Sequence, residues 1–235
     1  MELTHPTQAR YGVHVRRPGG YVVGVDLGQS NDFTAITVNE IVKEHFEQSF
    51  DGSPDRIVRH HHLRHAQRLP LGTPYPDVAE FVGNLIKSLS IGERATNIKP
   101  ALVVDGTGVG KPVIDMMHRL KLNPIGVAIT GGREENSGGA FSHSVPKRNL
   151  VSSLIVTFQE GRLKLASGIP AIRILENELV NFKARVSASG HETFDAWRDS
   201  IHDDLVLSLA LAVWWGERNA QAARFMNKLD FLPPR

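Results

Sequence analysis

The chain contains no cysteine among its 235 residues. This absence excludes both a disulfide framework and a zinc site with thiolate ligands. The longest apolar run, residues 205–215, is interrupted by Ser208 and is too short to cross a bilayer. Residues 1–10 are polar and lack the apolar segment of a signal peptide. We therefore expect a cytoplasmic protein with no membrane partner.

The chain also lacks a large excess of charge of one sign, since 27 Lys and Arg stand against 25 Asp and Glu. This balance is compatible with nucleic-acid binding but does not require it. Eight cations fall in or beside expected loops and hairpins, where they are either scattered surface charges or parts of one groove. These cations are Arg16, Arg17, Lys147, Arg148, Arg162, Lys164, Lys183 and Arg185.

Hydrophobic periodicity predicts strands and helices in alternation, which is typical of a mixed α/β sheet with parallel members and helices on its faces. The expected strands are 21–26, 33–39, 56–63, 101–105, 124–129 and 162–165. The expected helices are 76–89, 112–120, 150–158, 170–182 and 203–218. The first two strands are joined by Gly, Ser, Asn and Asp residues, which predicts a β-hairpin.

Three stretches lie outside this regular pattern. Residues 130–146 are rich in Gly and Ser, which predicts one long mobile loop. Residues 182–188 and 192–197 predict an added edge hairpin around Gly190. The expected organisation is an arm or linker remnant over 1–20, one domain over 21–218 and a tail over 219–235.

The residues most informative about function are four aspartates. Asp26 and Asp105 each end an apolar strand, whereas Asp203 and Asp204 open the apolar helix. An unpaired carboxylate is costly to bury, and a bound cation compensates its charge. Oxygen-only donors suit Mg²⁺ or Mn²⁺, and two such ions suit phosphodiester cleavage.

Each aspartate also has an ordinary structural interpretation. Asp26 could close a turn, Asp105 could cap the next helix, and the acid pair could offset a helix dipole. Neighbours on a helix face about 100° apart, so only one of the pair can face the other acids directly. We expect Asp203 to be the principal ligand, and Asp204 to be an auxiliary ligand or to orient it.

Three further residues are possible auxiliaries of such a site. His202 either assists proton transfer or caps the helix, and Asp32 is either an auxiliary acid or a turn residue. Lys147 either contacts a phosphate and stabilises the transition state or is simply solvated. The run His60–His62 is not expected to bind one ion, because neighbours on a strand point to opposite faces, and we expect these histidines at the surface.

Four segments, taken in order, carry a resemblance to a known family. They are GVDLGQSNDFTAI over 24–36, VVDGTGVG over 103–110, VPKRNL over 145–150 and HDDL over 202–205. Together they resemble the C-terminal nuclease domain of the phage large terminase subunit, over roughly residues 21–218. The resemblance implies a ribonuclease H-like fold, with a mixed central sheet flanked by helices and an added β-hairpin.

The resemblance also implies a function. It indicates a two-metal-ion endonuclease, using Mg²⁺ or Mn²⁺, that cuts concatemeric viral DNA during genome packaging in an infected host cell or a prophage-carrying bacterium. Asp26, Asp105 and Asp203 would be catalytic and bind metal together with Asp204. Double-stranded DNA would lie on Lys147, Arg148, Arg162, Lys164, Lys183 and Arg185. Implied partners are a packaging ATPase domain, the small terminase subunit and the portal.

One departure and three alternatives stay open at this stage. The glycine-rich stretch 106–111 is too short for a Walker A loop, and Pro112 stands where that loop needs Ser or Thr. This stretch therefore does not indicate the packaging ATPase. The alternatives are a Holliday-junction resolvase or transposase-like nuclease of the same fold, an actin- or sugar-kinase-like ATP-binding domain, and a catalytically inactive remnant.

Overall fold

The computed structural model describes residues 14–28, 32–46, 56–92, 99–108, 110–138, 142–188 and 203–229. For residues 14, 91–92, 182–188 and 219–229 it describes only the backbone. Among the helices of these ranges, none is both long enough and apolar enough to span a membrane.

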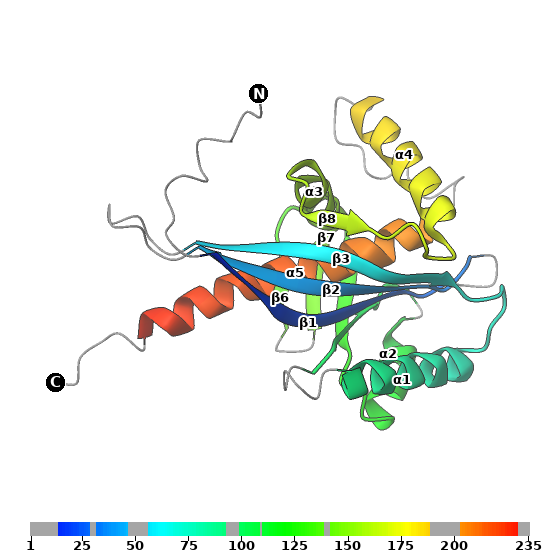
Figure 1. Ribbon diagram of the computed structural model, residues 1–235. Helices are drawn as coiled ribbons and strands as arrows, with labels where there is room; N and C mark the ends of the chain where they lie inside the picture. The colour runs from blue at the N-terminus through cyan, green and yellow to red at the C-terminus, as the bar shows by residue number, and fades with distance from the viewer. Residues whose placement is uncertain are drawn as a thin grey trace.

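The centre of the molecule is one mixed sheet, with the strand order β6-β7-β5-β4-β1-β2-β3-β8 (Figure 1). β1 pairs antiparallel with β2, and β2 pairs antiparallel with β3. β4 is parallel to β1, and both β5 and β7 run in the same direction as β4. At the two ends of the sheet, β8 is parallel to β3 and β6 is antiparallel to β7. The strands are β1 His14–Asp26, β2 Ala35–Phe46, β3 Arg56–Arg68, β4 Ala101–Asp105, β5 Ile125–Thr130, β6 Asn136–Ser137, β7 Ser142–Pro146 and β8 Leu163–Leu165. This pairing places the carboxyl ends of β1, β3, β4, β5, β7 and β8 at one edge of the sheet, which we call the carboxyl edge.

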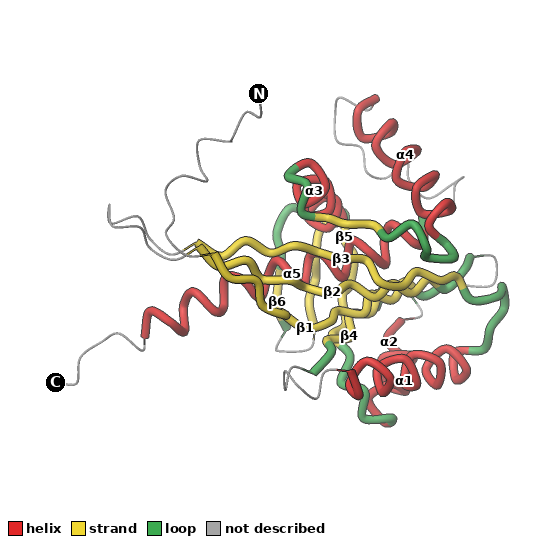
Figure 2. Tube along the Cα trace, in the orientation of Figure 1, coloured by secondary structure: helices red, strands yellow, loops and turns green. Residues whose placement is uncertain are grey.

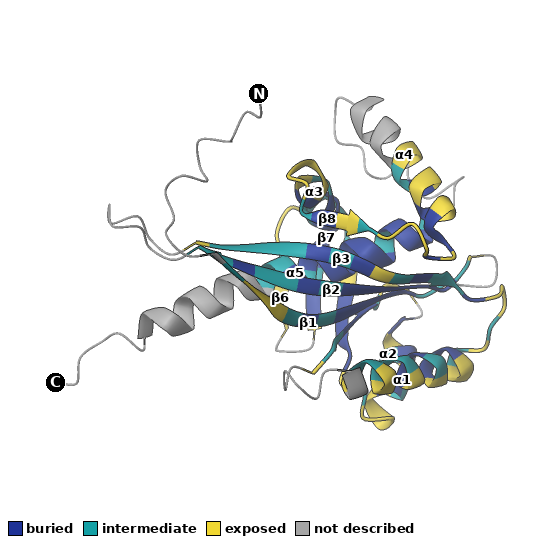
Figure 3. Cartoon of the chain, viewed as in Figure 1, coloured by how far each residue is buried: buried dark blue, intermediate teal, exposed yellow. Residues whose placement is uncertain are grey.

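Helices cover both faces of the sheet (Figure 2). They are α1 Tyr75–Gly92, α2 Gly110–Arg119, α3 Lys147–Gln159, α4 Ile172–Ala188 and α5 Asp204–Leu229. Alternate residues of a strand point to opposite faces, so Val23 and its partners pack under α1 and α2, whereas Val22 packs under α3 and α5. Figure 3 shows this as buried strands between helices whose outer sides are exposed.

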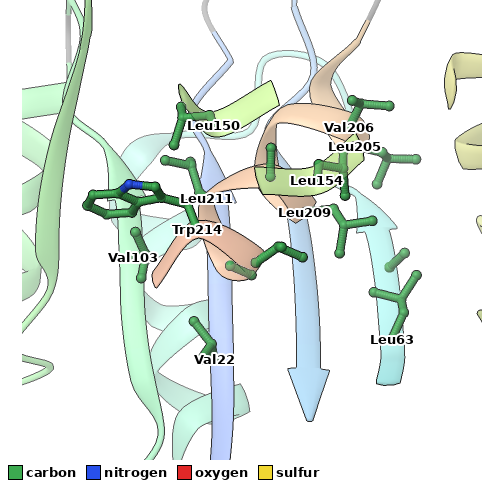
Figure 4. Packing of buried hydrophobic residues seen from close by; sticks show 14 of the residues in the cluster. Val22, Leu63, Val103, Leu150, Leu154, Leu205, Val206, Leu209, Leu211 and Trp214 are labelled. Atoms are coloured by element: carbon green, nitrogen blue, oxygen red, sulfur yellow. The ribbon is translucent and has the colours of Figure 1, made fainter. Parts of the chain in front are cut away.

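Helix α5 is the most deeply buried helix in the described ranges, and it contacts β1, β2, β3 and β4. Leu205, Leu209 and Leu211 are fully buried, and Figure 4 shows them packed with Leu150 and Leu154 of α3. Close approach to the sheet depends on glycine. A Cβ atom on Gly24 of β1 would collide with the carbonyl oxygen of Ser208.

The fold class predicted from the sequence is confirmed. The hairpin β1–β2, the third strand, the parallel β4 and the late helix α5 follow in the order expected of a ribonuclease H-like sheet. Two boundaries differ from the expected ones. β1 begins at His14, within the stretch expected to be an arm, and α5 continues to Leu229, within the expected tail.

Three local predictions are wrong. Residues 130–146 are not one long loop, because β7 pairs with β5 along five consecutive residues and β6 pairs with β7. Residues 182–188 belong to α4 and form no edge hairpin, while 192–197 lie outside the described residues. His61 is fully buried rather than at the surface, because α5 lies over its strand.

Candidate active site

Two of the predicted acids meet because their strands are parallel neighbours. Val25 of β1 is in register with Val104 of β4, so the next residues, Asp26 and Asp105, emerge together at the carboxyl edge. The two carboxylates lie close enough that repulsion from Asp105 raises the pKa of Asp26. The Asp105 carboxylate also accepts a hydrogen bond from the backbone N–H of Thr107 at 2.8 Å, which orients it.

The other two acids reach the same edge from α5. The helix begins at Asp204, and the carbonyl of Asp203 accepts the first helical hydrogen bond, from the N–H of Leu207 at 2.9 Å. Asp204 is 7% exposed. Both carboxylates lie close enough to Asp26 to raise its pKa. The structure therefore brings together all four aspartates, and we call Asp26, Asp105, Asp203 and Asp204 the acid cluster.

The acid cluster carries more negative charge than its surroundings neutralise. Burial raises the pKa of Asp26 well above its ordinary value, and repulsion from Asp105, Asp204 and Asp203 adds to the rise. Burial also raises the pKa of Asp105, although hydrogen bonds from Thr107 oppose it. Buried carboxylates that repel one another favour either protonation or the arrival of a cation.

Lys147 is the first of two cations that the structure places against the acid cluster. Thr130 of β5 is in register with Pro146, so β7 ends at the carboxyl edge and α3 begins there with Lys147. Its Nζ lies 3.8 Å from Oδ2 of Asp203, and its charge lowers the pKa of both Asp26 and Asp105. Lys147 therefore offsets part of the negative charge of the acid cluster.

Arg68 is the second cation, and the sequence analysis did not identify it. It ends β3, and its Nη2 lies 3.4 Å from Oδ2 of Asp204. The same Nη2 donates a 2.7 Å hydrogen bond to Oε1 of Glu178, and the guanidinium lies over the ring of Phe33 at 4.9 Å. No local pattern distinguishes Arg68 from the other cations of β3, because its role depends on strand pairing.

Glu178 of α4 was also missed, although a signal for it exists. It falls three residues after the buried Leu175, so a carboxylate stands on the apolar face of a helix. Its Oε2 accepts a 3.0 Å hydrogen bond from the N–H of Val206 in the first turn of α5. An N–H group in the first turn of a helix has no acceptor within that helix, so this contact stabilises the start of α5. Burial raises the pKa of Glu178 to about 7, with repulsion from Asp204 and Asp203 contributing.

The remaining candidates are more dispersed. Asp32 is exposed and lines a pocket of about 270 Å³ with Gly28, Thr34 and Tyr75, beside the end of β1. His202 lies outside the described residues, as do the side chains of Lys183 and Arg185. Asp32 therefore lines a pocket that contains no member of the acid cluster, and the position of His202 stays a prediction.

The basic residues predicted to bind DNA do not form one group. Arg148 lies in the first turn of α3 and donates to the backbone carbonyl of Arg133 at 2.5 Å. Arg162 has a side chain only 13% exposed and is engaged by Glu160 and Glu217. Lys164 is exposed on the edge strand β8. Lys147 and Arg148 are thus at the carboxyl edge, whereas Arg162 is occupied beside Glu217, far along α5 from the acids.

The donor chemistry of the acid cluster fits a hard divalent cation, because it consists of carboxylate oxygens. As the side chains stand, however, no three His, Asp or Glu residues of the described ranges are spaced to hold one ion. Asp203 and Asp204 are instead drawn toward Lys147 and Arg68. Ion binding would thus require these carboxylates to turn from their cationic neighbours toward the ion.

No family model matches this chain, and no curated protein matches it significantly. Among solved structures, it is similar to the large terminase nuclease from the thermophilic phage G20c, at 16% identity over 82% of this chain and 80% of that one, with a TM-score of 0.45. It is also similar to the Mn-soaked terminase nuclease domain of human cytomegalovirus, at 11% identity over 90% and 86%, with a TM-score of 0.49. These likenesses are remote.

The raised pKa of Glu178 predicts how stability depends on pH. A carboxyl whose pKa rises from 4.5 to about 7 on folding stabilises the protein fully below pH 4.5, and this contribution is lost as pH rises through 7. Glu178→Gln should therefore reduce the fall in unfolding free energy between pH 4.5 and 8 by about 3 kcal/mol. Urea unfolding with a chelator present measures this difference.

The matched control for that measurement is Glu176→Gln, since Glu176 is exposed on the same helix. It should leave the pH profile of the protein unchanged. An identical pH profile for Glu178→Gln and the unsubstituted protein would contradict the assignment of a raised pKa to this carboxyl.

Proposed function

We propose that this chain is a metal-dependent DNA endonuclease, the nuclease part of a viral DNA-packaging terminase. The observation that carries the proposal is the convergence of Asp26, Asp105, Asp203 and Asp204 from β1, β4 and α5 at one edge of the sheet. Three separate segments supply these acids, and burying them together is unfavourable unless a cation compensates them. The resemblance in the four sequence segments supports the same conclusion.

In this proposal Asp26, Asp105 and Asp203 hold two Mg²⁺ or Mn²⁺ ions, and Asp204 assists them. When bound, such ions activate a water and stabilise the leaving 3′-oxygen of the scissile phosphate. Asp26 is repelled by each of the other three aspartates, so its charge is the one that a bound cation would relieve most directly. Lys147, beside Asp203, is placed to offset charge that develops on the phosphate.

The DNA should approach over the carboxyl edge, because the scissile phosphate must reach the acid cluster. Lys147 and Arg148 lie there, at the start of α3, and would contact phosphates without reading sequence. The packaging ATPase domain, the small terminase subunit and the portal are the partners that this function requires for translocation and assembly. Because phosphate contacts do not read sequence, cleavage by the chain alone should be nearly independent of DNA sequence.

The decisive experiment is a cleavage assay on supercoiled plasmid with Mn²⁺ or Mg²⁺, with and without a chelator. We expect nicked and linear products with either ion and none with chelator. No cleavage at any metal concentration would count against the proposal. Preference for a four-way junction over linear duplex would instead favour the resolvase alternative.

Arg148→Ala should weaken binding to a 30-base-pair duplex about fivefold to tenfold, because one phosphate contact is lost. The slope of log K against log salt should fall by about one. Fluorescence anisotropy between 50 and 200 mM salt, about the range over which phosphate contacts lose most affinity, measures both effects. Arg119→Ala is the control, because Arg119 is exposed at the end of α2 away from the carboxyl edge. Equal affinity and slope for both variants would remove Arg148 from the DNA surface.

A further inference from the structure

The two cations at the acid cluster are held in different ways. Lys147 approaches Asp203 at 3.8 Å, through an ion pair whose side chains are 19% and 17% exposed. Arg68 approaches Asp204 more closely, at 3.4 Å, and these side chains are 17% and 9% exposed. The shorter distance and the drier carboxylate make the attraction between Arg68 and Asp204 the stronger of the two.

Arg68 is also fixed in place by contacts outside the acid cluster. Glu178, with a side chain 4% exposed, accepts a 2.7 Å hydrogen bond from the same Nη2 that faces Asp204. The ring of Phe33 lies against the guanidinium. A guanidinium held on two sides loses little further freedom by facing Asp204, so its charge is already oriented. Glu178 itself is anchored to α5 through the N–H of Val206.

We propose that Arg68, anchored by Glu178, is a built-in countercharge for Asp204 that competes with a divalent cation for the acid cluster. This inference rests on the proposed function, because it takes the acid cluster as the cation site. Arg68 and Glu178 are positioning residues here, since they act on the ion through Asp204.

The competition follows from charge. The guanidinium offsets part of the repulsion among the four aspartates, which stabilises the acid cluster without a metal ion. A divalent cation that arrives at Asp204 is repelled by the same guanidinium and must draw the carboxylate away from it. Glu178 keeps Arg68 paired after Asp204 has turned, so the exchange leaves no buried charge alone. The result is a nuclease that binds its metal weakly.

The test is Mn²⁺ binding measured by calorimetry on the full chain at pH 8, above the pKa of about 7 for Glu178. Arg68→Met with Glu178→Gln removes both charges of the pair, keeps an apolar stem over Phe33 and keeps an acceptor for Val206. This double variant should bind Mn²⁺ at least about tenfold more tightly. Glu178→Gln alone should bind Mn²⁺ more weakly. In this variant Arg68 has lost the charged carboxylate of Glu178, so it pairs with the carboxylate of Asp204 only.

The control is Arg64→Met, since Arg64 lies on the same strand and pairs with Glu40 at the surface. It should leave Mn²⁺ affinity unchanged. General damage to the fold weakens metal binding, so tighter binding by the double variant is specific to the proposal. Unchanged or weaker binding by that variant would overturn it.

Asp203→Asn separates this failure from failure of the proposed function. If Asp203→Asn abolishes Mn²⁺ binding while the double variant binds as the unsubstituted protein does, the acid cluster is the metal site and only the countercharge is wrong. If Asp203→Asn leaves Mn²⁺ binding intact, the ion binds elsewhere, and both the proposed site and the countercharge are wrong.

Discussion

Asp26→Asn and Asp203→Asn should each reduce plasmid cleavage by roughly a thousandfold or more. Each substitution removes one carboxylate charge from an acid cluster whose members come from three different segments of the chain. Because amide and carboxylate have almost the same shape, the packing around each position should be retained. Initial rates of plasmid nicking in Mn²⁺ measure the loss.

Although Asp26→Asn should lower cleavage, it should raise the stability of the fold. Burial and the repulsion of three neighbouring aspartates raise the pKa of Asp26, so its ionised form destabilises the folded state as pH rises above the ordinary value of 3.8. The variant should therefore unfold at a higher temperature than the unsubstituted protein at pH 8 with chelator. A lower melting temperature together with full activity would contradict both the site and its electrostatics.

The control for both measurements is Asp115→Asn, because Asp115 is exposed on α2. It should retain full cleavage and unchanged stability. Full cleavage by Asp26→Asn or Asp203→Asn, beside a normal control, would remove that residue from the active site.

Gly24→Ala should destabilise the protein by about 3 kcal/mol or more, because the new methyl group has no room. A Cβ atom there collides with the backbone carbonyl of Ser208, which cannot rotate away as a side chain would. Relief requires α5 to move from the sheet, and the helix contacts β1, β2, β3 and β4. Urea unfolding measures the change in free energy.

The same movement should affect function. Ser208 lies one turn from Asp204, so a shift of α5 at this point carries Asp203 and Asp204 away from Asp26 and should lower cleavage as well. Gly168→Ala is the control, because a Cβ atom at Gly168 meets no other atom within 4 Å. Equal stability of the two variants would show that the close packing of α5 on β1 is not required.

Residues 130–146 are where the structure differs most from the sequence-based expectation near the acid cluster. The sequence predicts one long mobile loop, but β7 is part of the sheet and carries Lys147 to the acid cluster at a set position. A moving segment is therefore not needed to bring this cation to the site. If Arg68 is the countercharge of Asp204, weak metal binding at the acid cluster follows from Arg68 instead.

The sequence by itself determined the strands and the helix that carry the acids, and the ends at which the acids stand. Apolar runs that end in Asp26 and Asp105 predict strands, and the run after Asp204 predicts a buried helix, because periodicity and burial act within one segment. From parallel strands flanked by helices it follows that acids at strand ends share one edge. The mixed sheet and the candidate acids were therefore accessible without coordinates.

Only the tertiary structure decided what surrounds those acids. Arg68 reaches Asp204 because β3 pairs with β2 in a register that ends at the same edge, and Glu178 reaches Val206 because α4 packs on α5. β7 is a strand despite its polar sequence because β5 offers it a partner. Such contacts join residues far apart in the chain, and their free energy depends on packing and pairing that no local pattern contains.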